Sequence, residues 1–230
     1  MTAQTKKFIS VLVAVMLFVL MSLSLQPLGA AEPERDFSSA EGGNAWQFRV
    51  YLDDREIGYH HFYLAENGDV KQLRSVASFE YKLLFVKLFH YEHENLETWN
   101  GDCLQSIDSQ TDANGKPFRV DGRRSDGQFR VNATAGDATL PECVMTFAYW
   151  NPEFLEQPRL LNPQTGEYVD ISVEQAGSDI LEVRGQQVPA TRFRLTADDF
   201  DLTLWYSPDD EWLALESVAK GGHIIRYELS

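Results

Sequence analysis

The sequence predicts an all-β protein built on a single curved antiparallel sheet, a half-barrel or open barrel of about a dozen strands with one short helix. Three observations lead to this fold class. Many short segments alternate apolar and polar residues, turn residues such as Asn-Gly recur between them, and no long linker divides the chain. This spacing indicates neighbouring antiparallel strands, whereas a parallel sheet would need helices between its strands.

The N-terminal residues are typical of a secretory signal peptide. Lys6 and Lys7 precede an apolar run over residues 8–25, and a break with small residues ends at Ala30 and Ala31. We therefore expect a signal peptide over residues 1–31, cleaved after Ala30 or Ala31, in a periplasmic or secreted protein. The alternative is a retained membrane anchor, because the run approaches spanning length. No cysteine follows the run as a site for lipid attachment, so we expect no stable anchor after cleavage.

The net charge limits the partners. The formal charge is −15 at pH 7, and an acidic surface repels the phosphates of nucleic acids and anionic lipid headgroups. We therefore expect no nucleic-acid partner.

Both cysteines lie in the part of the chain that follows the signal peptide. An oxidising compartment would allow a disulfide between Cys103 and Cys143. Closing a loop of this length would stabilise the fold by roughly 4 kcal/mol. Two buried free thiols are the alternative. A redox role has less support, because neither residue belongs to a Cys-x-x-Cys pair.

Residues 32–44 are expected to form a flexible leader, and residues 45–230 one β domain. The first strand, residues 46–52, alternates apolar and polar side chains, and the second, residues 56–65, is apolar or aromatic on both faces. An Asn-Gly turn then leads into a return strand over residues 70–79. Later alternating segments predict strands over residues 102–111, 118–121, 129–133, 168–174, 180–183, 187–195, 200–206, 212–218 and 224–229.

The strand pattern is interrupted between residues 140 and 163. Asn151 followed by Pro152 has the form of a helix N-cap and a first helical residue, so we expect a short helix over residues 153–157. Large aromatic side chains surround it, and they either pack onto the sheet or cap an opening in it. These aromatic residues include Phe147, Tyr149, Trp150 and Phe154.

The most concentrated stretch covers residues 79–99, FEYKLLFVKLFHYEHENLETW. It joins an apolar half to a half rich in His, Glu and Tyr, and no turn signal interrupts it. We interpret it as a strand that ends in a hairpin turn. Alternation then places His90 and Glu92 on one face of the strand, and Tyr91 and His93 on the other.

Histidines near this stretch are weak catalytic candidates. If the strands that carry them pair, His60 or His61 could meet His90 and Glu92, and the group could hold zinc or transfer protons. Adjacent residues cannot share a strand face, and the alternative is ordinary hydrogen-bonded histidines. No complete zinc, nucleotide or hydrolase motif occurs in the sequence, so we assign no metal and no cofactor.

The apolar run at residues 83–89 is the other candidate feature. On a curved sheet it could line a cavity for an acyl chain or a similar apolar ligand, with two aromatic residues as a lid. The alternative is a core strand. The candidate ligand-binding residues are Leu84, Val86, Phe89, Tyr91, Trp150 and Phe154.

Several short motifs follow one another in a recognisable order: Ile57-Gly58-Tyr59-His60, Trp99-Asn100-Gly101, Thr111-Asp112-Ala113-Asn114-Gly115, Phe147-Ala148-Tyr149-Trp150-Asn151-Pro152, Leu160-Leu161-Asn162, Gln164-Thr165-Gly166 and Leu204-Trp205-Tyr206. This order resembles a family of exported bacterial proteins whose function is uncharacterised. The resemblance covers most of the chain after the signal peptide and implies no catalytic residue. More remotely, the layout is similar to periplasmic lipoprotein carriers, whose curved antiparallel half-barrel holds acyl chains.

The leading hypothesis is a periplasmic binding or carrier module for an apolar, lipid-like ligand. Export, the all-β pattern and the apolar run together support it. The alternative from another class is a metal-dependent or His/Glu-dependent envelope enzyme, and a third is an envelope scaffold or assembly protein without a ligand. The expected partner is therefore an apolar small molecule or lipid, and the sequence identifies no protein partner.

Overall fold

The computed structural model describes residues 44–83, 86–219 and 221–230. The predicted signal peptide, and the predicted leader up to residue 43, lie outside the described residues, so both stay predictions. Within the described part of the chain, no helix has the length and apolar character needed to span a membrane.

Thirteen strands of the described residues form one antiparallel sheet. The strands before the central connection are β1 (Asn44–Leu52), β2 (Arg55–Asn67), β3 (Val70–Leu83), β4 (Val86–Asn100), β5 (Cys103–Ala113), β6 (Lys116–Ser125), β7 (Gln128–Ala133) and β8 (Ala138–Leu140). The strands after it are β11 (Ser172–Val183), β12 (Gln186–Thr196), β13 (Asp201–Tyr206), β14 (Trp212–Val218) and β15 (Ile224–Leu229).

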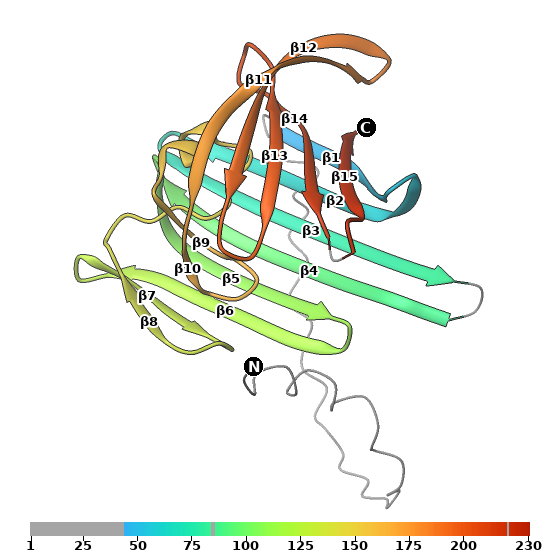
Figure 1. The fold of residues 1–230 in the computed structure, drawn as a ribbon. Helices are drawn as coiled ribbons and strands as arrows, with labels where there is room; N and C mark the ends of the chain where they lie inside the picture. Colours follow the sequence, from blue (N-terminus) through green and yellow to red (C-terminus); the bar gives the residue numbers. More distant parts are fainter. Residues whose placement is uncertain (1–43, 84–85, 220) are drawn as a thin grey trace, which may run out of the picture. The chain divides into compact units, whose positions relative to one another are not determined.

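The chain enters the sheet in its middle. β1 pairs with β2 on one side and with β15 on the other, so that Phe48 lies opposite both His60 and Leu229. From β1 the strands run in chain order to β8 at one edge, while β11 to β15 run from the other edge back to the centre. The sheet curves but does not close into a barrel (Figure 1). The predicted fold class is therefore confirmed.

One face of the sheet, here called the inner face, carries the core. In β1 the side chains of Trp46, Phe48 and Val50 are buried, whereas the residues that alternate with them, Gln47 and Arg49, are exposed. The same alternation in β4 buries the odd-numbered residues from His93 to Trp99. Because successive side chains of a strand point to opposite faces, these residues define the inner face along each strand.

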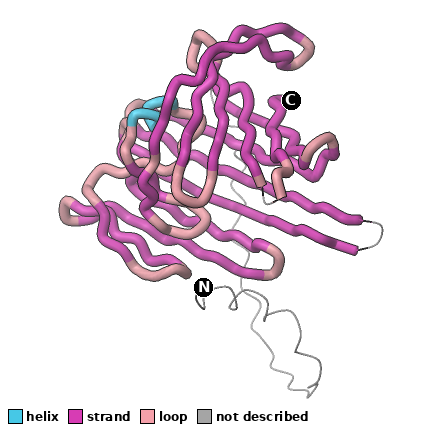
Figure 2. The backbone as a smooth tube through the Cα atoms, in the orientation of Figure 1, coloured by secondary structure: helices cyan, strands magenta, loops and turns pink. Residues whose placement is uncertain are grey.

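A covering segment, residues 141–171, packs against the inner face. It contains the 3₁₀ helix η2 (Pro152–Glu156) and the short strands β9 (Arg159–Leu161) and β10 (Tyr168–Asp170), which pair with each other. The oxygen of the Asn151 side chain accepts a hydrogen bond from the backbone N–H of Glu153. The predicted cap and short helix are thus present, although as a 3₁₀ helix (Figure 2).

Two links attach the start of the covering segment to β5. Cys103 and Cys143 form a disulfide with their Cα atoms 4.8 Å apart, which confirms the expected pairing. The backbone N–H of Leu104 also donates to the carbonyl of Val144 at 3.0 Å. The segment is therefore fixed to the sheet at the point where it crosses onto the inner face.

The strand predictions were wrong in four places. Residues 79–99 are not one strand, because β3 ends at Leu83 and β4 begins at Val86. This connection contains no Gly, Pro, Asn or Asp, so the usual signals of a turn are missing. The strands predicted over residues 168–174 and 180–183 are instead β10 and one long strand, β11, with a bulge between Gln175 and Gly177. The short strands β8 and β9 were not predicted.

Candidate functional site

A cavity of about 350 Å³ lies on the inner face of the sheet. Its walls come from β2, β3 and β4 on one side, from β13, β14 and β15 on another, and from the covering segment. Most of its lining is aromatic or aliphatic, and the two halves of the sheet both contribute. Examples are Phe62, Phe79, Phe89, Leu202, Leu215 and Ile225.

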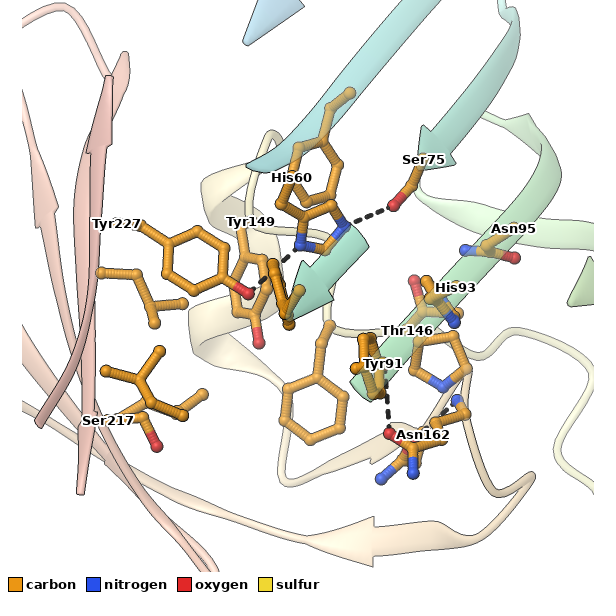
Figure 3. Close-up of a pocket in the computed structure, with 18 of the residues that line it drawn as sticks. His60, Ser75, Tyr91, His93, Asn95, Thr146, Tyr149, Asn162, Ser217 and Tyr227 are labelled. Atoms are coloured by element: carbon orange, nitrogen blue, oxygen red, sulfur yellow. Dashed lines mark hydrogen bonds between the residues drawn. The ribbon is translucent and has the colours of Figure 1, made fainter. Parts of the chain in front are cut away.

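Polar side chains of β2, β3 and β4 also line this cavity (Figure 3). The register places His60 of β2 and His93 of β4 on either side of Ala77 of β3. Their ring centroids are 6.2 Å apart. Two residues further along β3, on the same face, Ser75 lies opposite Asn95 of β4. Alternation along three adjacent strands therefore groups these four polar side chains, here called the polar layer, on one wall of a mostly apolar cavity.

His60 is held by hydrogen bonds at both ring nitrogens. Nε2 lies 2.7 Å from the Ser75 hydroxyl, and Nδ1 lies 3.3 Å from the hydroxyl of Tyr227. The ring also stacks on Phe62 with a centroid distance of 4.1 Å. Burial lowers the pKa of His60 well below 6.5, and the neighbouring His93 and His61 lower it further. His60 is therefore a neutral imidazole at neutral pH.

His93 is the second buried imidazole. Its Nδ1 lies 2.8 Å from the hydroxyl of Thr111 on β5, and only 6% of the residue is exposed. Burial lowers the pKa of His93 from 6.5 to about 4. Like His60, this ring can both donate and accept a hydrogen bond but carries no charge at neutral pH.

Glu97 is the one carboxyl group that lines the cavity among the described residues. Its two oxygens accept hydrogen bonds from Asn95 Nδ2 at 2.9 Å and from Trp99 Nε1 at 3.0 Å. Burial raises the pKa of Glu97, while the bonds from Asn95, Thr146 and Trp99 act in the opposite direction. Burial dominates, which favours the protonated form relative to an exposed carboxyl.

Three tyrosines add neutral hydroxyl groups. Tyr91 donates to Gln164 Oε1 at 3.2 Å, which ties β4 to the covering segment. Burial raises the pKa of Tyr91, of Tyr149 and of Tyr227, so each remains protonated at neutral pH. All three line the cavity, and Figure 3 shows their rings around it.

The structure separates the four catalytic candidates. His60 points to the inner face, whereas His61 packs between Tyr59 and Tyr63 on the other face. Glu92 is exposed and accepts a hydrogen bond from Ser78, and His90 Nδ1 lies 4.0 Å from it.

The suggested group of His60 or His61 with His90 and Glu92 is therefore not assembled. Strand pairing places His61 level with Glu94, beyond the intervening strand. Among the described residues, no group of three or more His, Cys, Asp and Glu side chains could hold a metal ion.

Of the six candidate ligand-binding residues, Phe89 and Tyr91 line the cavity. Leu84 lies outside the described residues, as does the side chain of Val86. Trp150 and Phe154 do not line this cavity, since both are buried in the large core. Trp150 packs edge-on against Trp99 with a centroid distance of 5.6 Å. The proposed lid is thus part of the packing beneath the covering segment.

Sequence reasoning missed most of the cavity wall. Phe147 and Tyr149 belong to the aromatic cluster around the predicted helix, but they are not among the six candidate ligand-binding residues. Tyr149 packs 4.9 Å from Trp212, and Phe147 packs 5.6 Å from Phe200. Trp212 and Phe200 lie more than fifty residues later in the sequence than Tyr149 and Phe147, so no local sequence signal identifies these contacts.

Ser75, His60 and Tyr227 form a hydrogen-bonded chain on the wall of the cavity. Ser75 and His60 have the spacing of a nucleophile and a base, but Tyr227 takes the place of the carboxylate that orients such a histidine. Ser75 is also 2% exposed within a strand. Apolar walls with a few convergent polar groups are instead the usual composition of a site for a small molecule.

Comparisons with known proteins agree with the fold. The crystal structure of a beta-barrel-like protein of a domain of unknown function, DUF1849, from Brucella abortus matches with a TM-score of 0.60 at 8% sequence identity. The match covers 81% of this chain and 94% of that chain. A comparison with curated proteins gave no match. Residues 48–230 match the model of a family described as a domain of unknown function, DUF6134. The expected resemblance to an uncharacterised family is thereby confirmed.

Proposed function

Because the chain belongs to the DUF6134 family, a domain of unknown function, its function has to be inferred from the cavity, and we propose that it binds an apolar, lipid-like small molecule. The observation that carries this proposal is the apolar lining of the cavity with a polar layer on one side. A purely structural core would be filled to the density of an organic crystal. The space on the inner face instead has the volume of a site for one small ligand.

The position of the cavity supports the same function. Both halves of the sheet and the covering segment contribute to its walls, so a ligand there would contact elements that are far apart in the chain. Binding would stabilise the native state by an amount that grows with the logarithm of the ligand's concentration relative to its dissociation constant. A carrier or sensor that reports occupancy needs this property.

The proposal also includes the compartment in which the protein works. The Cys103–Cys143 disulfide is consistent with an oxidising compartment outside the cytoplasm, and the predicted signal peptide would deliver the chain there. We assign the protein to the periplasm or the exterior as a binding or carrier module for its ligand.

The first test is native mass spectrometry of the chain purified from its own cells without detergent, followed by denaturing extraction. An apolar molecule at one copy per chain would support the proposal and give its chemical class. An empty chain that also fails to bind an uncharged apolar dye such as Nile red would contradict it. A stable complex with another protein would then favour the scaffold hypothesis.

A variant that fills the cavity makes the test specific. Ser217 of β14 lines the cavity, and Val218 next to it is 57% exposed. Ser217→Phe should weaken Nile red binding by about tenfold or more, because the new ring occupies the ligand's space. Val218→Phe adds the same ring to the same strand but on the opposite face, so it should bind like the unmodified chain. Equal affinity for all three proteins would place the dye outside the cavity.

A further inference from the structure

Resting on the proposed function, we propose that the ligand is an uncharged amphiphile whose hydroxyl or carbonyl group faces the polar layer, and that the cavity discriminates against ionised carboxylates. The cavity geometry carries this inference through three features. They are a described lining without Lys or Arg side chains, two neutral histidines, and hydroxyl and amide groups that line the cavity.

No Lys or Arg side chain lines the cavity in the described part of the chain. On β15, Ile225 and Tyr227 reach the cavity, whereas Arg226 between them lies on the other face, where its guanidinium stacks on Tyr51 and pairs with Glu228. Among these described side chains, an ionised carboxylate that entered would lose its hydration without gaining a counter-charge. Burying such an unpaired charge is strongly unfavourable.

The two histidines do not supply the missing charge. Burial is the main cause that lowers the pKa of both His60 and His93, and the only carboxyl group in the described lining is Glu97. Protonating either ring would place a cation in the apolar cavity, where burial disfavours the charged form. The polar layer therefore consists of neutral hydrogen-bonding groups.

Hydroxyl and amide groups of the lining are available for a neutral head group. Among the described residues, the buried Oδ1 of Asn95 has no hydrogen-bond partner, and the hydroxyl-bearing Tyr149 and Ser217 also line the cavity (Figure 3). A hydroxyl can donate to a carbonyl oxygen or accept from an alcohol. These groups can thus satisfy an alcohol, an ester or a ketone but cannot neutralise a carboxylate.

The test compares two probes that share one chain length, dodecanol and dodecanoate, in displacing Nile red at neutral pH. We expect dodecanol to bind about tenfold or more tightly, because the anion must be desolvated without a partner. The chain's net charge of −15 would also repel the anion, so the comparison is repeated at high salt. Surface repulsion is screened there, whereas the cost of desolvation inside the cavity remains.

A matched pair of variants introduces the missing cation. Ser217→Lys places an ammonium group at the cavity wall, and Val218→Lys adds the same charge to the opposite face of the strand. Dodecanoate should gain about tenfold in affinity in the first variant relative to the second. Circular dichroism of each variant checks that the fold is retained, and the comparison of probes on the unmodified chain needs no variant.

The outcomes separate the two proposals. Tighter binding of dodecanol that persists at high salt supports the inference. Binding of dodecanoate as tight as that of dodecanol, or a preference that disappears at high salt, would overturn the inference but leave the proposed function intact. Failure of the unmodified chain to bind Nile red and both probes would overturn the proposed function, and the inference with it.

Discussion

At the scale of single residues, His93 shows how burial couples protonation to stability. Its folded-state pKa of about 4 lies below the unfolded value of 6.5. Between these values the unfolded state binds more protons, so the contribution of His93 to stability is complete above pH 6.5 and is lost as the pH falls toward 4. The loss amounts to about 3 kcal/mol.

We predict that His93→Gln removes this part of the acid sensitivity. Glutamine cannot take up a proton, and its amide can still bond the hydroxyl of Thr111. At neutral pH the variant should be less stable than the unmodified chain by about 1 kcal/mol. This deficit should shrink and then reverse as the pH approaches 4, when urea unfolding is measured across the series. A deficit that stays constant over the whole range would contradict the burial of a neutral ring.

The residue scale also shows what the sequence could reveal. Strand periodicity predicted that His90 and Glu92 share one face and that Tyr91 and His93 share the other, and the structure confirms both placements. The exposed face is the one with Glu92 and Glu94, which carry charge. Periodicity could not show that His60 belongs with His93, because that pairing depends on the register across β3.

At the scale of elements, a disulfide attaches the covering segment covalently to β5. The disulfide closes a loop with a sequence separation of 40 residues. Replacing both cysteines by serine should lower the free energy of unfolding by roughly 4 kcal/mol, since the unfolded chain regains the entropy that the loop removed. Urea unfolding of the Cys103→Ser, Cys143→Ser double variant measures this change.

The reduced form of the unmodified chain is the natural control for that experiment. It has the same sequence but lacks the cross-link, so its stability should match that of the double variant. A loss below about 1 kcal/mol in both proteins would mean that the covering segment is held almost entirely by its packing.

Elements were predictable where local chemistry defines them. The Asn67-Gly68 turn, the cap at Asn151 and the strands β14 and β15 follow from alternation and turn residues, and the structure contains all of them. The connection between β3 and β4 was missed because its residues carry no turn signal. The sequence predicts two strands where β11 is one, since the bulge in β11 shifts the alternation by one residue.

At the scale of the whole sheet, the pairing of β1 with β15 could not be predicted. These strands come from opposite ends of the described chain, and either could have been an edge strand by its sequence. Their pairing makes one continuous sheet and lets Phe48 pack against Trp212 with a centroid distance of 4.2 Å. The cavity depends on the same pairing of β1 with β15, because its walls come from the strands on both sides of this pair.

From this shared core we predict that residues 45–230 unfold as one cooperative unit. Trp99 lies on β4 and Trp212 on β14, so Trp99→Phe and Trp212→Phe variants each remove a fluorescence signal from one half. In each variant, the urea transition followed by the remaining tryptophans should coincide with the transition followed by circular dichroism. The two halves share a core cluster and a strand pair, so neither can lose its structure without exposing buried surface of the other. Separate transitions for the two signals would show that the junction between β1 and β15 does not couple the halves, and would divide the predicted domain in two.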